Sequence, residues 1–285
     1  MREEKLFSWP RGAEAAVTLS FDGGYSKTVE AAAPLLLEAG YCATWFLVSG
    51  AVGKELEGRP VAPWSVWRDM AASGMELGSH TVSHPRLKGG LADRTRGYLR
   101  KCRRLVTSFT GRKIVGTCET QQEVDELRMC DEAVGAARAI EQAVAGLRVV
   151  SFAYPHGRYS QRLIRMLEDR GFWSARTTDD GINTYPVARY KLLSKVVTRR
   201  TSGAVLDSWV ARAVEMKGWL IETYHLVTEQ GEEDYYWEIR ADQLRRHLES
   251  IAKQRVWVAT QREVSAWLLG VMDQGGKGRE ILERY

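Results

Sequence analysis

Residues 15–48 read AAVTLSFDGGYSKTVEAAAPLLLEAGYCATWFLV, and this stretch contains the unit from which the fold is built. Residues 15–21 are apolar and β-prone, which predicts a strand. A helix-prone run follows at residues 28–39 and ends at Gly40, and residues 43–48 predict a second strand. Two strands joined by a helix of this length pair in parallel through a right-handed crossover. The stretch therefore predicts a βαβ unit.

The same alternation of strand and helix continues along the chain. Further strands are expected at residues 75–77, 149–153, 172–176, 192–197, 219–224 and 255–259. Helices are expected at residues 64–73, 92–106, 122–146, 161–170, 205–217, 244–253 and 263–269. Seven or eight such units in one domain close most naturally into a barrel, with an open doubly wound sheet as the alternative. The sequence therefore predicts an α/β fold with a (β/α) barrel of seven or eight parallel strands.

The composition is that of a globular protein without a strong net charge. Hydrophobic residues make up 44% and charged residues 27% of the 285 positions, which excludes disordered and collagen-like chains. No linker and no internal repeat interrupts the sequence, so we expect one domain over residues 1–285. The net charge of +5 comes from 41 basic and 36 acidic residues interleaved along the chain, and it does not indicate a nucleic-acid partner.

The cysteines and the first residues bear on the cellular compartment. Cys42, Cys102, Cys118 and Cys130 form no C-x-x-C pair, so a zinc ribbon and thioredoxin-like chemistry are not expected. No basic stretch leads into an apolar segment at the start, and no apolar run is long enough to span a membrane. We expect a cytoplasmic protein, although a secreted or surface protein trimmed of its signal peptide would have the same sequence. The oligomeric state stays open.

Polar residues follow two of the expected strands. Asp22 stands directly after residues 15–21 and precedes Gly23 and Gly24, a pattern that is also an ordinary turn. His80 and His84 follow residues 75–77 at a spacing of four. Imidazole is the commonest metal ligand, so this pair predicts a metal site; the alternative is two surface histidines close by coincidence.

Histidines also follow two later strands. His156 comes after residues 149–153 and His225 after residues 219–224, so four of the five histidines lie just past expected strands. In a (β/α) barrel the functional side chains lie at the carboxyl ends of the strands, which places these histidines on one rim. The fifth, His247, lies in an arginine-rich helix and is expected to be solvated.

In this order, the motifs resemble the polysaccharide deacetylase family (NodB-homology, carbohydrate esterase type). The matching stretches are TLSFDGG at 18–24, ATWFLV at 43–48, GSHTVSH at 78–84, FAYPHG at 152–157, YH at 224–225 and VWVAT at 256–260. The resemblance spans almost the whole chain. It implies a distorted (β/α) barrel and a metal-dependent hydrolase that removes acetyl groups from an N-acetylated carbohydrate.

The resemblance also implies a role for each matching residue. Asp22 would be the base, His80 and His84 would bind a divalent metal, usually zinc, and His225 would be the acid that protonates the departing amine. The backbone N–H of His156 would help hold the tetrahedral oxyanion.

The first motif departs from the family pattern. The family has two consecutive aspartates, the first acting as base and the second binding the metal, but the second position here is Gly23. Two neutral histidines should bind a divalent cation less tightly than a set that includes a carboxylate. Asp22 itself, a water, Asp179 or Asp180 could take the vacated position.

Two positions around the third motif also differ. Ala153 stands where the family often has an arginine that orients the catalytic aspartate, and Arg176 is a possible substitute, although an arginine after a strand is most often a solvated charge. His156 stands where an aromatic residue is usual. It could line the substrate groove together with Tyr154 and Pro155, or add a ligand or an acid.

Three functions remain open at this point. The first is a metal-dependent deacetylase of a polysaccharide or oligosaccharide. The second is a carbohydrate-binding pseudoenzyme whose metal site is impaired by Gly23. The third is a related hydrolase of a non-sugar C–N bond, such as that of a ureide or a cyclic imide.

Overall fold

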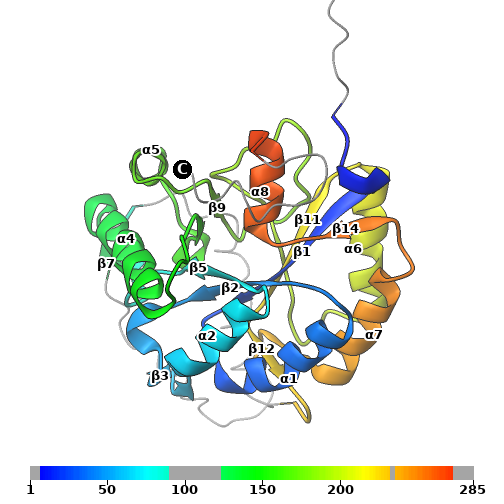
Figure 1. Cartoon of the computed structure of the whole chain (residues 1–285), viewed down its shortest axis with the longest axis horizontal. Helices are drawn as coiled ribbons and strands as arrows, with labels where there is room; N and C mark the ends of the chain where they lie inside the picture. Colours follow the sequence, from blue (N-terminus) through cyan, green and yellow to red (C-terminus); the bar gives the residue numbers. More distant parts are fainter. Residues whose placement is uncertain (1–6, 90–122, 232–234, 272–285) are drawn as a thin grey trace, which may run out of the picture.

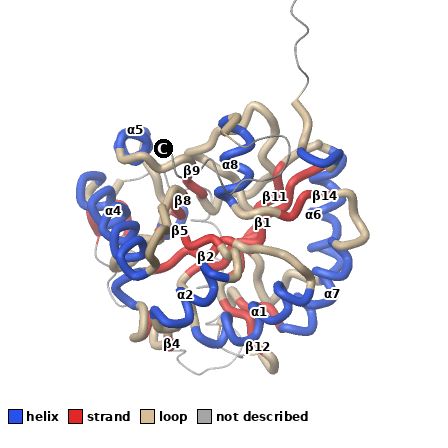
Figure 2. The backbone as a smooth tube through the Cα atoms, viewed as in Figure 1, coloured by secondary structure: helices blue, strands red, loops and turns tan. Residues whose placement is uncertain are grey.

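A curled sheet of eight parallel strands forms the centre of the molecule (Figures 1 and 2). The structure is a computed structural model that describes residues 7–89, 123–231 and 235–271. The strands are β1 (Ala15–Asp22), β2 (Thr44–Leu47), β5 (Glu76–Ser79), β8 (Ser151–Ala153), β9 (Ser174–Arg176), β10 (Lys195–Val196), β11 (Trp219–Tyr224) and β14 (Val256–Val258). Their order is β10-β11-β1-β2-β5-β8-β9, and β14 pairs with β1. The predicted distorted (β/α) barrel is confirmed.

Helices surround this sheet at nearly all the predicted positions (Figure 2). They are α1 (Ser26–Glu38), α2 (Trp64–Ala72), α4 (Glu126–Ala143), α5 (Gln161–Asp169), α6 (Gly203–Glu215), α7 (Ala241–Ile251) and α8 (Gln261–Leu269). The helix predicted at residues 92–106 lies outside the described residues, as do Cys102 and Cys118. Cys42 and Cys130 are free thiols, as expected.

The barrel also carries short strands and 3₁₀ turns that the sequence did not predict. The strand pairs are β3 (Glu55–Leu56) with β4 (Arg59–Pro60), β6 (Arg86–Leu87) with β7 (Glu123–Val124), and β12 (Leu226–Thr228) with β13 (Glu238–Arg240). Three 3₁₀ turns are present at η1 (Pro10–Gly12), η2 (Ser49–Ala51) and η3 (Pro155–Gly157). Elements of two or three residues carry too little periodicity to be recognised in a sequence.

Strand β1 is buried along its whole length because it has neighbours on both sides and helices outside. The ring of Phe21 stacks on Trp45 and Tyr224, with ring centroids 4.4 Å and 5.1 Å apart. Such large aromatic side chains contribute much of the apolar burial in a core. The carboxyl end of β1 is therefore a rigid platform for the residue that ends it, Asp22.

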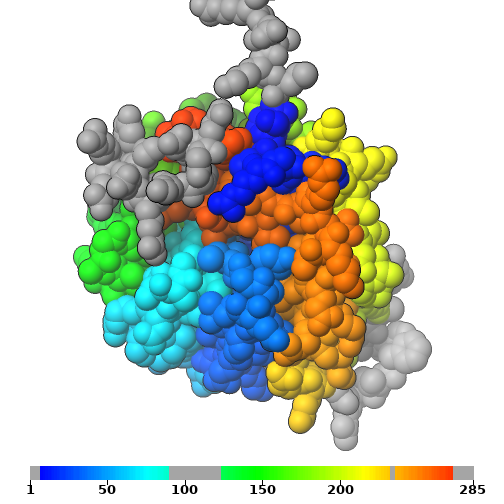
Figure 3. Space-filling model, turned by 45° about the vertical axis from the view of Figure 1, so that its right-hand side comes forward, coloured from blue at the N-terminus to red at the C-terminus, as the bar shows by residue number. Residues whose placement is uncertain are grey.

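Segments far apart in the sequence close the outer layer. Helices α1 and α7 lie side by side, and Arg245 of α7 pairs with Glu38 of α1 at 2.7 Å. In the space-filling view, the orange segment that contains α7 covers the blue segment that contains α1 along one side (Figure 3). In the described part of the chain, none of the helices combines the length and the apolar character needed to cross a bilayer.

Candidate active site

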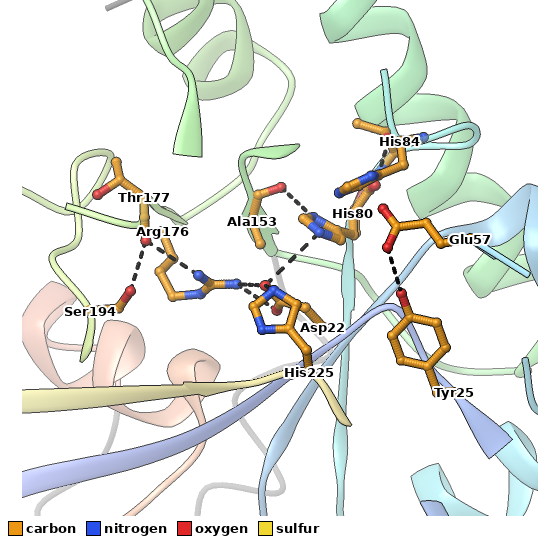
Figure 4. Close-up of polar contacts among 12 residues, drawn as sticks. Asp22, Tyr25, Glu57, His80, His84, Ala153, Arg176, Thr177, Ser194 and His225 are labelled. Carbon is orange, nitrogen blue, oxygen red and sulfur yellow. Dashed lines mark hydrogen bonds and ion pairs between the residues drawn. The ribbon is translucent and has the colours of Figure 1, made fainter. Parts of the chain in front are cut away.

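Asp22 and Arg176 form a buried ion pair in the middle of the barrel rim (Figure 4). Asp22 ends β1 and Arg176 ends β9, so the curvature of the sheet brings together residues that are 154 positions apart. The Nη2 atom of Arg176 donates to both carboxylate oxygens, at 2.5 Å and 2.6 Å. Both side chains are almost fully buried. Arg176 thus orients Asp22, and the alternative of a solvated surface charge is wrong.

His80 follows β5 and faces the Asp22 carboxylate. Its Nδ1 lies 2.9 Å from the carbonyl oxygen of Ala153, which can only accept, so Nδ1 carries the proton. In the neutral ring Nε2 is then an acceptor, and it lies 4.0 Å from Oδ2 of Asp22. Two acceptors at this separation favour a cation or a water molecule between them.

His225 faces the same carboxylate oxygen from another strand. It follows β11, and its Nε2 lies 3.9 Å from Oδ2 of Asp22. The backbone carbonyl of His225 accepts a hydrogen bond from the hydroxyl of Thr28, which ties the residue to α1. Its Nδ1 is buried and has no hydrogen-bond partner among the described residues. Asp22 therefore stands between two imidazoles and one guanidinium.

His84 lies between His80 and His156. The ring centroids are 4.7 Å apart for His80 and His84, and 4.6 Å apart for His84 and His156. Within the described part of the chain, the buried Nε2 of His156 has no hydrogen-bond partner. His84 and His156 have φ values of 54° and 56°, in the left-handed region that costs about 1–3 kcal/mol for a non-glycine residue. The surrounding structure therefore holds both rings in place at a conformational cost.

Helix α4 holds the loop that carries His80 and His84. Glu132 of α4 accepts hydrogen bonds at Oε2 from the backbone N–H groups of Val82 and Ser83, at 3.1 Å and 2.9 Å. The Ser79 hydroxyl donates to the carbonyl of Ala133 on the same helix. The amphipathic pattern of α4 predicted a helix but gave no sign of this contact, because Glu132 looks like any surface acid in a sequence.

The environment sets the protonation of the site. Burial alone would raise the pKa of Asp22, but Arg176 and the nearby histidines hold it below its ordinary value. Burial also lowers the pKa values of the four histidines, and those of His156 and His225 fall to about 4. At neutral pH the site therefore contains an ionised carboxylate, an arginine cation and four neutral imidazoles.

Gly23 has no side chain at the position where the resemblance implies a second aspartate. Its φ is +91°, and a Cβ atom placed there would lie 2.8 Å from the ring of Tyr25. The backbone N–H of Gly23 donates to the carbonyl of Phe46 at 3.0 Å, which fixes the peptide. A larger residue at position 23 would have to displace the Tyr25 ring.

The two aspartates considered as substitutes have other partners. Asp180 pairs with Lys195 at 2.8 Å and its side chain is exposed, and Asp179 accepts a hydrogen bond from the hydroxyl of Tyr159 at 3.2 Å. The expectation that either one fills the vacated position finds no support in these contacts. Asp22 is also engaged, since Arg176 bonds both of its oxygens.

The donor chemistry of the site fits a divalent metal, although the rings are not yet gathered around one point. Neutral imidazoles are good zinc ligands, and His80 has its second nitrogen fixed by a carbonyl in the way that metal-binding histidines usually do. The unpartnered Nε2 of His156 adds a third buried nitrogen. In the described ranges, no three histidine, cysteine, aspartate or glutamate side chains already converge to hold an ion.

Tyr154 and Pro155 lie directly before His156 and are buried. The hydroxyl of Tyr154 donates to the carbonyl of Tyr190 at 3.1 Å. The backbone of Pro155–Gly157 forms η3, which carries His156 to the rim. A role of Tyr154 and Pro155 in a substrate groove stays a prediction.

An aromatic wall beside His225 escaped the sequence analysis. Trp237 lies 6.1 Å from His225, and Tyr235 lies 5.8 Å from Trp237 and 6.5 Å from Tyr25, measured between ring centroids. The guanidinium of Arg59 stands 4.2 Å over the Tyr235 ring. A cavity of about 250 Å³ adjoins this wall and is lined by Tyr25, Lys27, Gly58, Arg59, Pro60 and Leu226. Aromatic faces of this kind stack on the apolar faces of sugar rings.

Comparisons of the sequence point to one family. A family model described as "Polysaccharide deacetylase" matches residues 10–175. The protein YxkH of Bacillus subtilis (strain 168), whose name places it among the polysaccharide deacetylases, is 21% identical over 197 residues. That match covers 69% of this chain and 57% of YxkH, so the chain spans little more than half the length of this relative.

Solved structures share the fold. A Mycobacterium smegmatis protein named as a polysaccharide deacetylase is 16% identical, with a TM-score of 0.59 over 93% of each chain. The Xyl-CE4 domain of a xylanase from a Trinervitermes trinervoides hindgut metagenome is 16% identical, with a TM-score of 0.52 over 90% of this chain and 92% of that one. A mutant of BA3943, described as a CE4 family pseudoenzyme with restored enzymatic activity, is 14% identical, with a TM-score of 0.52 over 88% and 67%.

Proposed function

Because this chain belongs to the polysaccharide deacetylase family, we propose that it is a metal-dependent hydrolase that removes N-acetyl groups from a polysaccharide or oligosaccharide. One observation carries the proposal. The buried carboxylate of Asp22 is held by Arg176, and its Oδ2 atom faces the Nε2 atoms of His80 and His225 at 4.0 Å and 3.9 Å. This arrangement places a base (Asp22), an acid (His225) and a metal ligand (His80) next to one another.

His80 and His84 would hold the metal, which we propose to be zinc. A divalent ion at this position would polarise the amide carbonyl and lower the pKa of a bound water. Asp22 is ionised at neutral pH and is ready to take a proton from the attacking water. Its hydrogen bonds to Arg176 keep the carboxylate fixed while that proton moves.

His225 has to gain the proton that it donates. Its pKa of about 4 leaves the resting ring neutral, so a proton must reach it during each cycle. Oδ2 of Asp22 is 3.9 Å from Nε2 of His225 and is the group placed to pass the proton taken from water. The amine then leaves after accepting this proton from His225.

A carbohydrate-binding pseudoenzyme is the second candidate, and the surroundings of Gly23 favour it. The Tyr25 ring lies where a side chain at position 23 would begin, and this is the position at which the resemblance would place a metal-binding aspartate. The fold is shared with BA3943, which is itself described as a pseudoenzyme. In this case the partly exposed ring of Trp237, which packs against Tyr235, would still bind sugar.

The test is release of acetate from N-acetylated oligosaccharides, compared with non-sugar amides, with and without added zinc. We expect acetate from the sugars and a fall in kcat of about 10²–10⁴-fold in Asp22→Asn, because the base is removed. Asp180→Asn makes the same chemical change at an exposed aspartate and should keep full activity. Sugar binding without acetate release would support the pseudoenzyme, and release from non-sugar amides alone would reassign the substrate.

A further inference from the structure

We propose that His156 is a metal ligand in this chain and takes the place of the aspartate that Gly23 replaces, so that His80, His84 and His156 together hold the ion. The inference rests on the proposed function, because it concerns the metal that this function requires. It goes beyond that function by assigning the vacated position to a residue of a different motif, 133 residues later in the chain (156 − 23).

The first observation is a continuous row of imidazoles. The ring of His84 contacts those of His80 and His156, with centroid separations of 4.7 Å and 4.6 Å. Each neutral imidazole presents one nitrogen with an unshared electron pair, which can accept a hydrogen bond or bind a cation. A cation satisfies all three at once, and three protein ligands plus a water form the usual ligand set of hydrolytic zinc.

The second observation is the nitrogen that lacks a partner. Nε2 of His156 is buried, and within the described residues no hydrogen-bond donor or acceptor meets it. A buried polar atom in this condition is costly, and beside two further histidines the nitrogen is placed to bind an ion or a water molecule. Two arginines, Arg86 and Arg158, lie near enough to lower the pKa of His156, and Nη1 of Arg158 donates to the carbonyl of Leu87 at 2.9 Å.

The third observation is that the backbone holds His156 at the rim. Its left-handed conformation is followed by Gly157, which also has a positive φ of 65°. A Cβ atom on Gly157 would lie 2.9 Å from the backbone nitrogen of Thr178, so the turn fits only with glycine there. The fold therefore imposes the conformation that presents the ring of His156 to His84.

Other carboxylates near the site have partners of their own. Both oxygens of Asp22 accept from Arg176, and the side chain of Glu57 accepts from the hydroxyl of Tyr25 at 3.5 Å. Among the described residues the nitrogens of His80, His84 and His156 do not yet converge on one point, so ion binding requires the rings to turn. That rearrangement gives the inference a spectroscopic signature.

The experiment is titration of the metal-stripped full chain with Zn²⁺ by calorimetry and with Co²⁺ by visible spectroscopy. Four proteins are compared: wild type, His156→Gln, His156→Glu and His225→Gln. We expect wild type to bind one Zn²⁺, and His156→Gln to weaken binding by more than the roughly 10–100-fold that loss of an outer-shell partner costs. His156→Glu places an ionised ligand at the same reach and should restore affinity, and the ligand-field bands of Co²⁺ should change between these two variants.

His225→Gln is the matched control, since it removes a histidine of the same rim that is outside the proposed ligand set. Its Zn²⁺ affinity should fall by no more than the roughly 10–100-fold that loss of an outer-shell partner costs, and circular dichroism establishes that each variant is folded. Unchanged affinity and an unchanged Co²⁺ spectrum in His156→Gln would overturn the inference and leave the metal-dependent function standing. Failure of wild type to bind Zn²⁺ would overturn both the inference and the metal dependence, and acetate release without metal would then separate a hydrolase from a pseudoenzyme.

Discussion

Two buried pairs of a carboxylate and an imidazole lie on neighbouring strands of the barrel and behave in opposite ways. One is Asp22 on β1 with its histidines, and the other is Glu222 on β11 with His247 of α7. Strands β1 and β11 pair in register, with Phe21 opposite Tyr224. Nε2 of His247 lies 3.0 Å from both oxygens of Glu222, and the hydroxyl of Tyr224 donates to the same carboxylate at 2.7 Å.

The two pairs differ in whether an arginine already pairs with the carboxylate. Arg176 already compensates the charge of Asp22, so burial dominates and the pKa of His225 falls to about 4. No arginine or lysine pairs with Glu222 in the part of the chain that the structure describes. Burial again lowers the pKa of His247, but Glu222 and, at 3.4 Å from Nδ1, Asp207 outweigh it and the pKa ends above its ordinary value. Arg176 beside Asp22, together with the shorter contact of 3.0 Å between His247 and Glu222 against 3.9 Å between His225 and Asp22, accounts for the opposite pKa shifts.

Removal of Arg176 should give the histidines beside Asp22 raised pKa values, like that of His247 beside Glu222. In Arg176→Gln we expect the pKa values of His80 and His225 to rise, because the charge of Asp22 is no longer shared. Activity should fall by about 10–100-fold, as for loss of other groups that orient a site. NMR titration of the imidazole resonances and kcat measure the two effects.

Two variants keep this prediction testable if the loss of a buried partner lowers stability. Arg176→Lys retains the charge but not the shared hydrogen bonds, so the histidine pKa values should stay low while activity drops. Lys195→Gln removes a cation that pairs with exposed Asp180 and should change neither quantity. Histidine pKa values that stay low in Arg176→Gln would show that Arg176 is not what distinguishes the two pairs.

The sequence predicts the barrel and part of the rim, because strand and helix patterns and the residues that end each strand can be read from short stretches of sequence. The strand expected at residues 219–224 is observed as Trp219–Tyr224, since a β-prone run stands between Gly218 and His225. Asp22, His80 and His225 were expected at strand ends, and the parallel arrangement of strands brings them together.

The rest of the site depends on contacts that no local pattern encodes. The pair of Asp22 and Arg176 joins residues 154 positions apart across the barrel. His247 was expected to be solvated, which is wrong: α7 turns it inward to a glutamate that lies in an otherwise apolar strand. Helical periodicity identifies the buried face of α7, but it does not identify Glu222 as the residue that this face contacts.

Loss of charge on Glu222 should destabilise the protein without affecting the site. Glu222→Gln removes the buried counter-charge of His247 and leaves only the exposed Asp207 at 3.4 Å from Nδ1, and breaking a buried pair costs about 3–5 kcal/mol. The free energy of unfolding in urea measures the loss, and kcat of the folded protein should be unchanged. The double variant Glu222→Gln with His247→Phe removes both charges and should recover much of the stability. A loss in the double variant equal to the sum of the losses in Glu222→Gln and His247→Phe would show that the pair is not coupled.

The smallest expected effect is the pH dependence of the melting temperature, Tm. The pKa of His247 is raised in the folded protein, so its stabilising contribution is complete below the ordinary histidine value of about 6.5 and is lost as the pH rises through the folded pKa. The pKa values of the site histidines are lowered, so these residues cost stability as the pH falls below about 6.5.

His247 therefore makes stability fall above about pH 6.5, and the site histidines make it fall below that pH. Tm of wild type should be highest near pH 6.5 and decline toward both sides, with about 2–4 °C for each kcal/mol of stability in a protein approaching this size. His247→Phe should flatten only the alkaline side, because the site histidines keep their lowered pKa values. Calorimetric scans of both proteins from about pH 5 to about pH 8.5 make the comparison. An alkaline decline that survives in His247→Phe would mean that the buried pair of Glu222 and His247 does not carry it.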